Sequence, residues 1–133
     1  MRILGIDYGE RKLGIAFGDF QTGLVEPLET LRITNFQAVK LRIKKIVEER
    51  EIEKIIIGIP GGEMNAKIQS FAEKLRREIG LVVEPYDETI STREANQITG
   101  LIGRSRKYKK KMEDAIAAAV MLKSYLEKEG RHV

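Results

Sequence analysis

The chain has 133 residues, 42% of them hydrophobic and 33% charged, which predicts one domain over 1–133 and excludes a disordered chain. It has no cysteine, and its single histidine, His132, is the penultimate residue. Disulfides and thiolate metal sites are therefore excluded, and the usual histidine general base is removed. The longest apolar run, Ala115–Leu122, is too short to cross a bilayer, so we expect a cytoplasmic protein with no membrane partner.

The first part of the chain is expected to form strands. Met1–Tyr8 is apolar and β-prone, Gly9–Lys12 reads as a turn, and Leu13–Gly18 is a second strand, which together predict a hairpin. A third strand lies within Leu24–Ile33, with Pro27 near its start or at a bulge. This part of the sheet is therefore expected to be antiparallel.

From residue 36 onward, helical periodicity alternates with short apolar runs. The alternating elements are a helix from Phe36, a strand at Lys54–Ile59 covered on both faces, a helix at Ala66–Ile79 and a strand at Leu81–Tyr86. A capping box at Ser91–Glu94 starts a third helix that stops near Gly100 or Gly103, and a last helix spans about Met112–Glu127. This order predicts an α/β fold with a five-stranded mixed sheet, antiparallel and then parallel, flanked by helices.

Asp7 interrupts an apolar strand. Period-two alternation puts it on the same face as Ile3 and Gly5, and a buried carboxylate is costly unless it is paired or bound to a cation. Gly5 is expected to leave open space beside the carboxylate. A salt bridge to Arg11 or Lys12 across the turn is the alternative explanation.

Further acidic residues follow the fifth strand and begin the last helix. Asp87 and Glu88 precede a helix, where a favourable interaction with the helix dipole would also explain them. The same explanation applies to Asp114, and less well to Glu113, but Asp114 shares a helix face with Ala118, Met121, Leu122 and Tyr125. Strand ends and the start of a helix packed on the sheet can converge, and crowded carboxylates raise one another's pKa.

A divalent cation would relieve such crowding. Without cysteine or a well-placed histidine, the ion should be one that prefers oxygen ligands, Mg²⁺ or Mn²⁺. Two ions roughly 3.5–4 Å apart can activate a water and stabilise the leaving oxygen of a phosphodiester. The predicted ligands are Asp7, Glu88 and Asp114, with Asp87 in reserve.

Basic residues are concentrated just before the last helix. The formal net charge is +4, and the run from 104 to 111 contains Arg104, Arg106, Lys107, Lys109, Lys110 and Lys111 with no acidic residue. One interpretation is a solvated surface loop. The favoured one is a loop that binds the phosphate backbone of a nucleic acid, together with Arg11.

Four short sequence motifs follow one another along the chain. They are the hairpin Gly5–Gly9 with Arg11, Gly14 and Ala16; the strand end Ile57–Pro60; the segment Asp87–Thr92; and Lys110-Lys111 followed by Asp114, Ala117 and Ala118. Together they resemble the YqgF (RuvX) family, whose members have a ribonuclease H-like fold, from Met1 to about Leu126. Two features depart from the family pattern: Thr89 replaces an arginine, and the loop Gly61–Ala66 is short.

The resemblance implies a Mg²⁺- or Mn²⁺-dependent nuclease, a hydrolase that cuts phosphodiester bonds in structured nucleic acid, endonucleolytically or exonucleolytically. It implies that Asp7, Glu88 and Asp114 are the catalytic carboxylates. Within the family, trimming of the 5′ end of the 16S ribosomal RNA precursor is favoured over cutting of Holliday junctions in branched DNA. Symmetric junction cutting needs a dimer, and the sequence leaves the oligomeric state open.

Two alternative functions remain from other classes. Actin-like kinases and ATPases also open with an Asp-x-Gly hairpin, but they need two domains, and this chain has no Gly-Lys-Ser/Thr phosphate loop. A non-catalytic nucleic-acid adaptor would use the run from 104 to 111 for affinity and its acidic residues only for structure.

Overall fold

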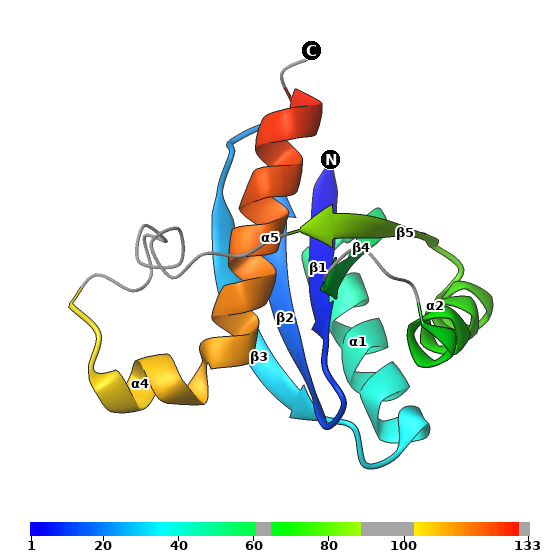
Figure 1. Cartoon of the computed structure of the whole chain (residues 1–133). Helices are drawn as coiled ribbons and strands as arrows, with labels where there is room; N and C mark the ends of the chain where they lie inside the picture. The colour runs from blue at the N-terminus through cyan, green and yellow to red at the C-terminus, as the bar shows by residue number, and fades with distance from the viewer. Residues whose placement is uncertain (61–64, 89–102, 131–133) are drawn as a thin grey trace.

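The described strands form one sheet with helices on both faces (Figure 1). A computed structural model of the chain describes residues 1–60, 65–88 and 103–130. Its elements are β1 (Arg2–Tyr8), β2 (Lys12–Asp19), β3 (Val25–Arg32), α1 (Phe36–Arg50), β4 (Lys54–Pro60), α2 (Ala66–Ile79), β5 (Val82–Glu88), α4 (Arg106–Lys111) and α5 (Glu113–Gly130). Among the described helices, none combines the length and the apolar character that a bilayer crossing requires.

The sheet is mixed, as predicted. Its strand order is β3-β2-β1-β4-β5. β2 pairs antiparallel with β1 and β3, whereas β4 pairs parallel with β1 and β5. The register between β2 and β3 shifts beside Pro27, which confirms the bulge expected there. The carboxyl ends of β1, β4 and β5 therefore meet at one edge of the sheet.

Strand alternation gives the sheet two buried faces. Leu4, Ile6 and Ile55 belong to a cluster that α1 and α2 cover. Ile3 and Ile56 belong to a second cluster, which α5 covers with buried side chains that include Ala118, Met121, Leu122 and Tyr125. Burying each large aliphatic side chain contributes about 1.5–3 kcal/mol. β4 supplies both clusters, which confirms a strand covered on both sides.

Asparagine caps explain why two helices begin where the sequence predicts. The Asn35 side-chain oxygen accepts from the backbone N–H of Gln37 (2.7 Å) and of Ala38 (3.3 Å) at the start of α1. The Asn65 oxygen accepts from the N–H of Ile68 (2.9 Å) at the start of α2. The helix predicted from Ser91 and the loop after Pro60 lie outside the described residues.

The prediction of a basic loop was wrong for Arg106–Lys111, which forms the helix α4. Ser105 caps this helix, because its Oγ accepts from the N–H of Tyr108 (3.1 Å). Tyr108 and Met112 pack against the cluster beneath α5. These two apolar contacts anchor a helix whose basic side chains are exposed. The last helix, α5, follows and ends at Gly130 rather than near Glu127.

Glycines on three strands allow α5 to approach the sheet closely. A Cβ at Gly14 would overlap the carbonyl oxygen of Asp114, and one at Gly58 would lie 3.1 Å from Cγ of Met121. A Cβ at Gly5 would lie 3.2 Å from Leu122. The open space expected beside Gly5 was therefore a wrong prediction, because Leu122 fills it. These glycines thus set the distance between α5 and the sheet.

Gly14→Ala is expected to lower the free energy of unfolding by about 1–3 kcal/mol, because overpacking forces two backbone segments apart. Thermal unfolding followed by circular dichroism measures the loss. Gly80→Ala is the control, since Gly80 has a φ of 81° but open space around it, so this variant loses stability through backbone strain alone. A melting temperature of Gly14→Ala equal to that of the parent would contradict the close approach.

Candidate functional site

Asp7 lies in a row of residues that crosses the sheet on the face covered by α5. Strand pairing places Thr30 opposite Gly14, and Gly14 opposite Asp7. On the other side, Asp7 is opposite Gly58, and Gly58 is opposite Tyr86. Both neighbours of Asp7 in this row lack side chains, so the half-buried carboxylate is flanked by backbone.

The start of α5 brings a second carboxylate to this row. The backbone of Asp114 rests on Gly14, the neighbour of Asp7. Burial of Asp7, together with the negative charge of Asp114, raises the pKa of Asp7 from 3.8 to about 6. The structure therefore brings Asp7 and Asp114 together, as the sequence predicted from their places on apolar faces.

The alternative explanation for Asp7, a salt bridge across the turn, does not hold. No ion pair between described residues involves Asp7, Arg11 or Lys12. Both basic side chains are exposed at the turn, whereas Asp7 is half-buried under α5. Among the described residues, no cationic side chain therefore offsets the cost of burying the Asp7 carboxylate.

β5 brings its acidic end to the same edge of the sheet. Glu88 pairs with Pro60, two positions beyond the pair formed by Tyr86 and Gly58, so its backbone lies just past the row that contains Asp7. The side chain of Glu88 lies outside the described part of the structure. Asp87 pairs with Ile59, and alternation places it on the opposite face from Tyr86, where it is exposed. The structure does not bring Asp87 to Asp7.

The pair formed by Asp7 and Asp114 suits a hard divalent cation. Carboxylate oxygens are the ligands that Mg²⁺ and Mn²⁺ prefer. The two negative charges repel each other, and a bound cation would relieve that repulsion. Among the described residues no group of three potential ligands occurs, and the side chain of Glu88 is not part of that set.

Thr30 is a polar residue of the row that sequence reasoning missed. Its hydroxyl oxygen is buried and has no hydrogen-bond partner in the described structure. The sequence does not indicate that Thr30 belongs to this row, because only the pairing of β2 with β1 and β3 places it two strands from Asp7.

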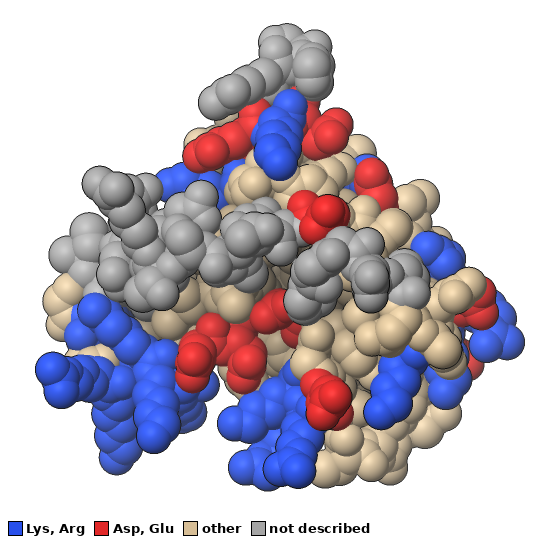
Figure 2. Space-filling model, viewed as in Figure 1, with Lys and Arg blue, Asp and Glu red and all other residues tan. Residues whose placement is uncertain are grey.

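Basic side chains lie on both sides of the acidic residues, as Figure 2 shows. The first group is exposed on and before α4 and consists of Arg104, Arg106, Lys107, Lys109, Lys110 and Lys111. Within it, the guanidinium of Arg104 lies 4.8 Å from the ring centre of Tyr108. The second group, at the end of the β1–β2 hairpin, consists of Arg11, Lys12 and Arg32, all exposed. The sequence predicted Arg11 here but missed Lys12 and Arg32, which come together only through strand pairing.

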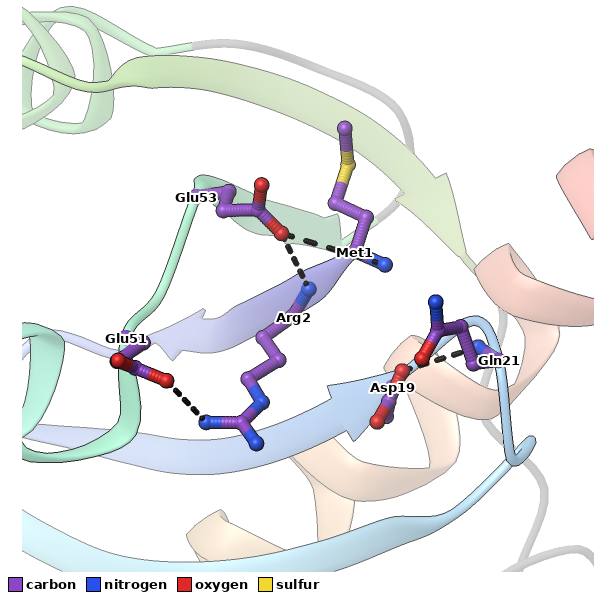
Figure 3. A pocket seen from close by; sticks show the side chains of 6 residues that line it. All are labelled: Met1, Arg2, Asp19, Gln21, Glu51 and Glu53. Carbon is purple, nitrogen blue, oxygen red and sulfur yellow. Dashed lines mark hydrogen bonds and ion pairs between the residues drawn. The ribbon is translucent and has the colours of Figure 1, made fainter.

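A pocket at the amino end of β1 is not a candidate for the cation (Figure 3). The backbone N–H of Arg2 donates to the Glu53 carboxylate (3.0 Å), and the guanidinium of Arg2 donates to the Glu51 carboxylate (3.0 Å). The amino group of Met1 lies 4.0 Å from Glu53. Glu51 and Glu53 are therefore each paired with a cationic group, whereas Asp7 has no such partner in the described part of the chain.

The raised pKa of Asp7 predicts that the stability of the metal-free protein depends on pH. Between the ordinary value of 3.8 and the folded value of about 6, the folded chain holds a proton that the unfolded chain has lost. The free energy of unfolding therefore falls as pH rises through this window, by at most about 2–3 kcal/mol at about 1.4 kcal/mol per unit. Asp7→Asn is expected to remove this fall and to raise the melting temperature in EDTA at neutral pH.

Thermal unfolding in EDTA from about pH 4 to pH 7 measures this effect. Glu10→Gln is the matched control, because Glu10 is an exposed acidic residue at the same end of the sheet. It should follow the parent profile. If Asp7→Asn and the parent lose stability equally over this range, Asp7 is not the group responsible.

Two solved structures share the fold. A Thermus thermophilus RuvC structure is 16% identical, with a TM-score of 0.64 over 98% of this chain and 98% of that one. The fowlpox virus resolvase, in complex with substrate Holliday junction DNA, is 14% identical, with a TM-score of 0.61 over 97% of this chain and 99% of that one. These likenesses confirm a ribonuclease H-like fold.

More similar proteins share the sequence over nearly its whole length. One from Caldanaerobacter subterraneus is 33% identical over 135 residues, covering 96% of both chains. One from Bacillus cereus (strain AH187) is 35% identical over 137 residues, covering 96% of this chain and 99% of that one. Both bear the provisional name pre-16S rRNA nuclease. The family model described as RuvX, Holliday junction resolvase, matches residues 1–128, and this chain therefore belongs to the RuvX (YqgF) family.

Proposed function

We propose that this chain is a nuclease that hydrolyses phosphodiester bonds with Mg²⁺ or Mn²⁺ held by Asp7, Glu88 and Asp114. The observation that carries the proposal is the pair of Asp7 and Asp114, which has no ion-pair partner among the described residues and in which burial and like charge raise the pKa of Asp7 to about 6. A member of the RuvX family with this pair has the acidic groups that metal-assisted hydrolysis requires.

The residues divide the work between binding the cation and holding the substrate. Asp7 and Asp114 supply oxygen ligands from β1 and from the first turn of α5, and Glu88 would supply a third from the end of β5. When bound, the cation supplies Lewis-acid activation of water and of the phosphate. Gly14 and Gly58 let α5 lie close to Asp7, with the backbone of Asp114 over Gly14 and Met121 over Gly58. The basic residues of α4 hold the phosphate backbone without reading sequence.

The favoured substrate is the 5′ end of the 16S ribosomal RNA precursor, which implies a cytoplasmic location. The relatives at 33% and 35% identity carry a name that refers to this RNA. Cutting of Holliday junctions is the second candidate, because the family description names it. The structures of junction resolvases are only 14% and 16% identical to this chain, so they support the fold rather than the substrate.

Asp7→Asn and Asp114→Asn are each expected to reduce Mg²⁺-dependent cleavage by about 100-fold or more, because each removes a direct ligand. The assay offers labelled precursor-rRNA ends and four-way DNA junctions with Mg²⁺ or Mn²⁺. Glu113→Gln is the matched control, since Glu113 is the exposed acidic neighbour of Asp114 in α5, and it should cut like the parent.

The same assay separates the alternative functions. Cleavage of one substrate and not the other identifies the substrate class. If the parent protein binds RNA but cuts neither substrate with either metal, the non-catalytic adaptor is correct. If Asp7→Asn cuts as fast as the parent, the activity comes from a contaminant.

Replacing Lys109, Lys110 and Lys111 together with glutamine is expected to weaken binding and to reduce its salt dependence. Each phosphate that no longer meets a lysine lowers the slope of log affinity against log salt by about 0.7–0.9, so the slope of the triple variant should fall by about 2–3. Fluorescence anisotropy at several KCl concentrations measures the slope. A triple glutamine variant at Lys44, Lys45 and Lys67, exposed on α1 and α2, is the control. Equal slopes for both variants would exclude α4 as the contact surface.

A further inference from the structure

A group of three basic side chains stands at the end of the β1–β2 hairpin and the paired end of β3. Lys12 is directly opposite Arg32 in the ladder between β2 and β3. The carbonyl oxygen of Arg11 accepts from the N–H of Ile33 (2.8 Å), which fastens the turn to the end of β3. All three basic side chains are exposed. We call Arg11, Lys12 and Arg32 the hairpin basic group.

The pairing of Lys12 with Arg32 opposes folding. Like charges directly opposite each other on neighbouring strands are destabilising. The two carboxylates of β3 do not relieve this, because Glu26 pairs with Arg50 (2.7 Å) and Glu29 with Arg42 (2.5 Å) on α1. No ion pair among the described residues includes a member of the hairpin basic group. Within the described part of the chain this basic group therefore lacks an anionic partner, and an external anion can supply one.

The group lies on the face that carries the carboxylates. Lys12 is two residues from Gly14, and Arg32 is two residues from Thr30, so alternation puts both on the α5 side of the sheet. Gly14 is paired with Asp7 and is covered by the backbone of Asp114. α4 extends away from the first turn of α5, on the side remote from the hairpin (Figure 1). In the space-filling view, acidic side chains lie between two sets of basic ones (Figure 2).

We propose that the hairpin basic group binds backbone phosphates of the nucleic acid on the side of the scissile bond opposite to the side held by α4. The inference rests on the proposed nuclease function and extends it. The substrate crosses the carboxylates and continues in both directions, so its backbone is held before and after the bond that is cut. Arginine contacts phosphate through a planar, bidentate fork and lysine through a mobile point charge, so both suit a backbone of variable course.

The double variant Lys12→Gln/Arg32→Gln tests the proposal. Binding is measured by fluorescence anisotropy in EDTA, over a KCl series, with a labelled four-way DNA junction and a labelled RNA stem-loop as probes. The slope of log affinity against log salt is expected to fall by about 1–2, at about 0.7–0.9 for each phosphate that the variant no longer neutralises. The melting temperature should not fall, because the variant removes a like-charge pair. Lys44→Gln/Lys67→Gln, exposed on α1 and α2, removes the same charge and is the control.

Combining the double variant with the α4 triple variant tests the two-sided arrangement. If the two groups bind different phosphates, their effects on affinity and slope should add. A slope equal to that of the parent, or a decrease in affinity no larger than that of the control, would overturn the inference while the parent still binds. If the parent binds neither probe, both the nuclease proposal and this inference fail.

Discussion

The contact between Gly14 and the backbone of Asp114 is the constraint on which the rest of the molecule depends. Because position 14 has no Cβ, the first turn of α5 comes down onto β2 beside Asp7. The same approach seals the second hydrophobic cluster, since Ala118 and Leu122 follow along α5 and are fully buried. It also removes water from Asp7 and sets a second carboxylate near it, which raises its pKa. This contact therefore both helps to pack α5 on the sheet and brings the two acidic residues together.

Most of the fold could be predicted from the sequence, because its signals are local. Alternation in β1 and β2, and the capping asparagines before α1 and α2, depend on neighbouring residues only. The errors arose where a distant contact decides. The sequence predicts a loop where α4 forms, because basic residues dominate the pattern there and the contact that anchors Tyr108 is made with a cluster formed by distant residues. The space beside Gly5 was misjudged, because Leu122 fills it from far along the chain.

The candidate site could be predicted from the sequence only in part. Asp7 and Asp114 were identifiable because each is an acid on an apolar face, and the structure brings them together. Alternation along β5 puts neighbouring residues on opposite faces, but only the pairing of β5 with β4 shows that Asp87 takes the face away from Asp7. Register also unites Lys12 with Arg32 and puts Thr30 in the row of Asp7. The sequence alone therefore could not show which residues face each other on neighbouring strands.

The position of Asp114 at the tip of α5 links the interior of the protein to its chemistry. The middle of α5 packs closely on the sheet, with Met121 against Gly58 and Leu122 against Gly5 and Gly18. A small tilt of α5 would move its first turn and change the distance between Asp7 and Asp114. Conservative changes deep in this interface could thus alter turnover without touching any group that meets the substrate. Packing between the inner face of α5 and the sheet therefore controls the geometry of the acidic pair.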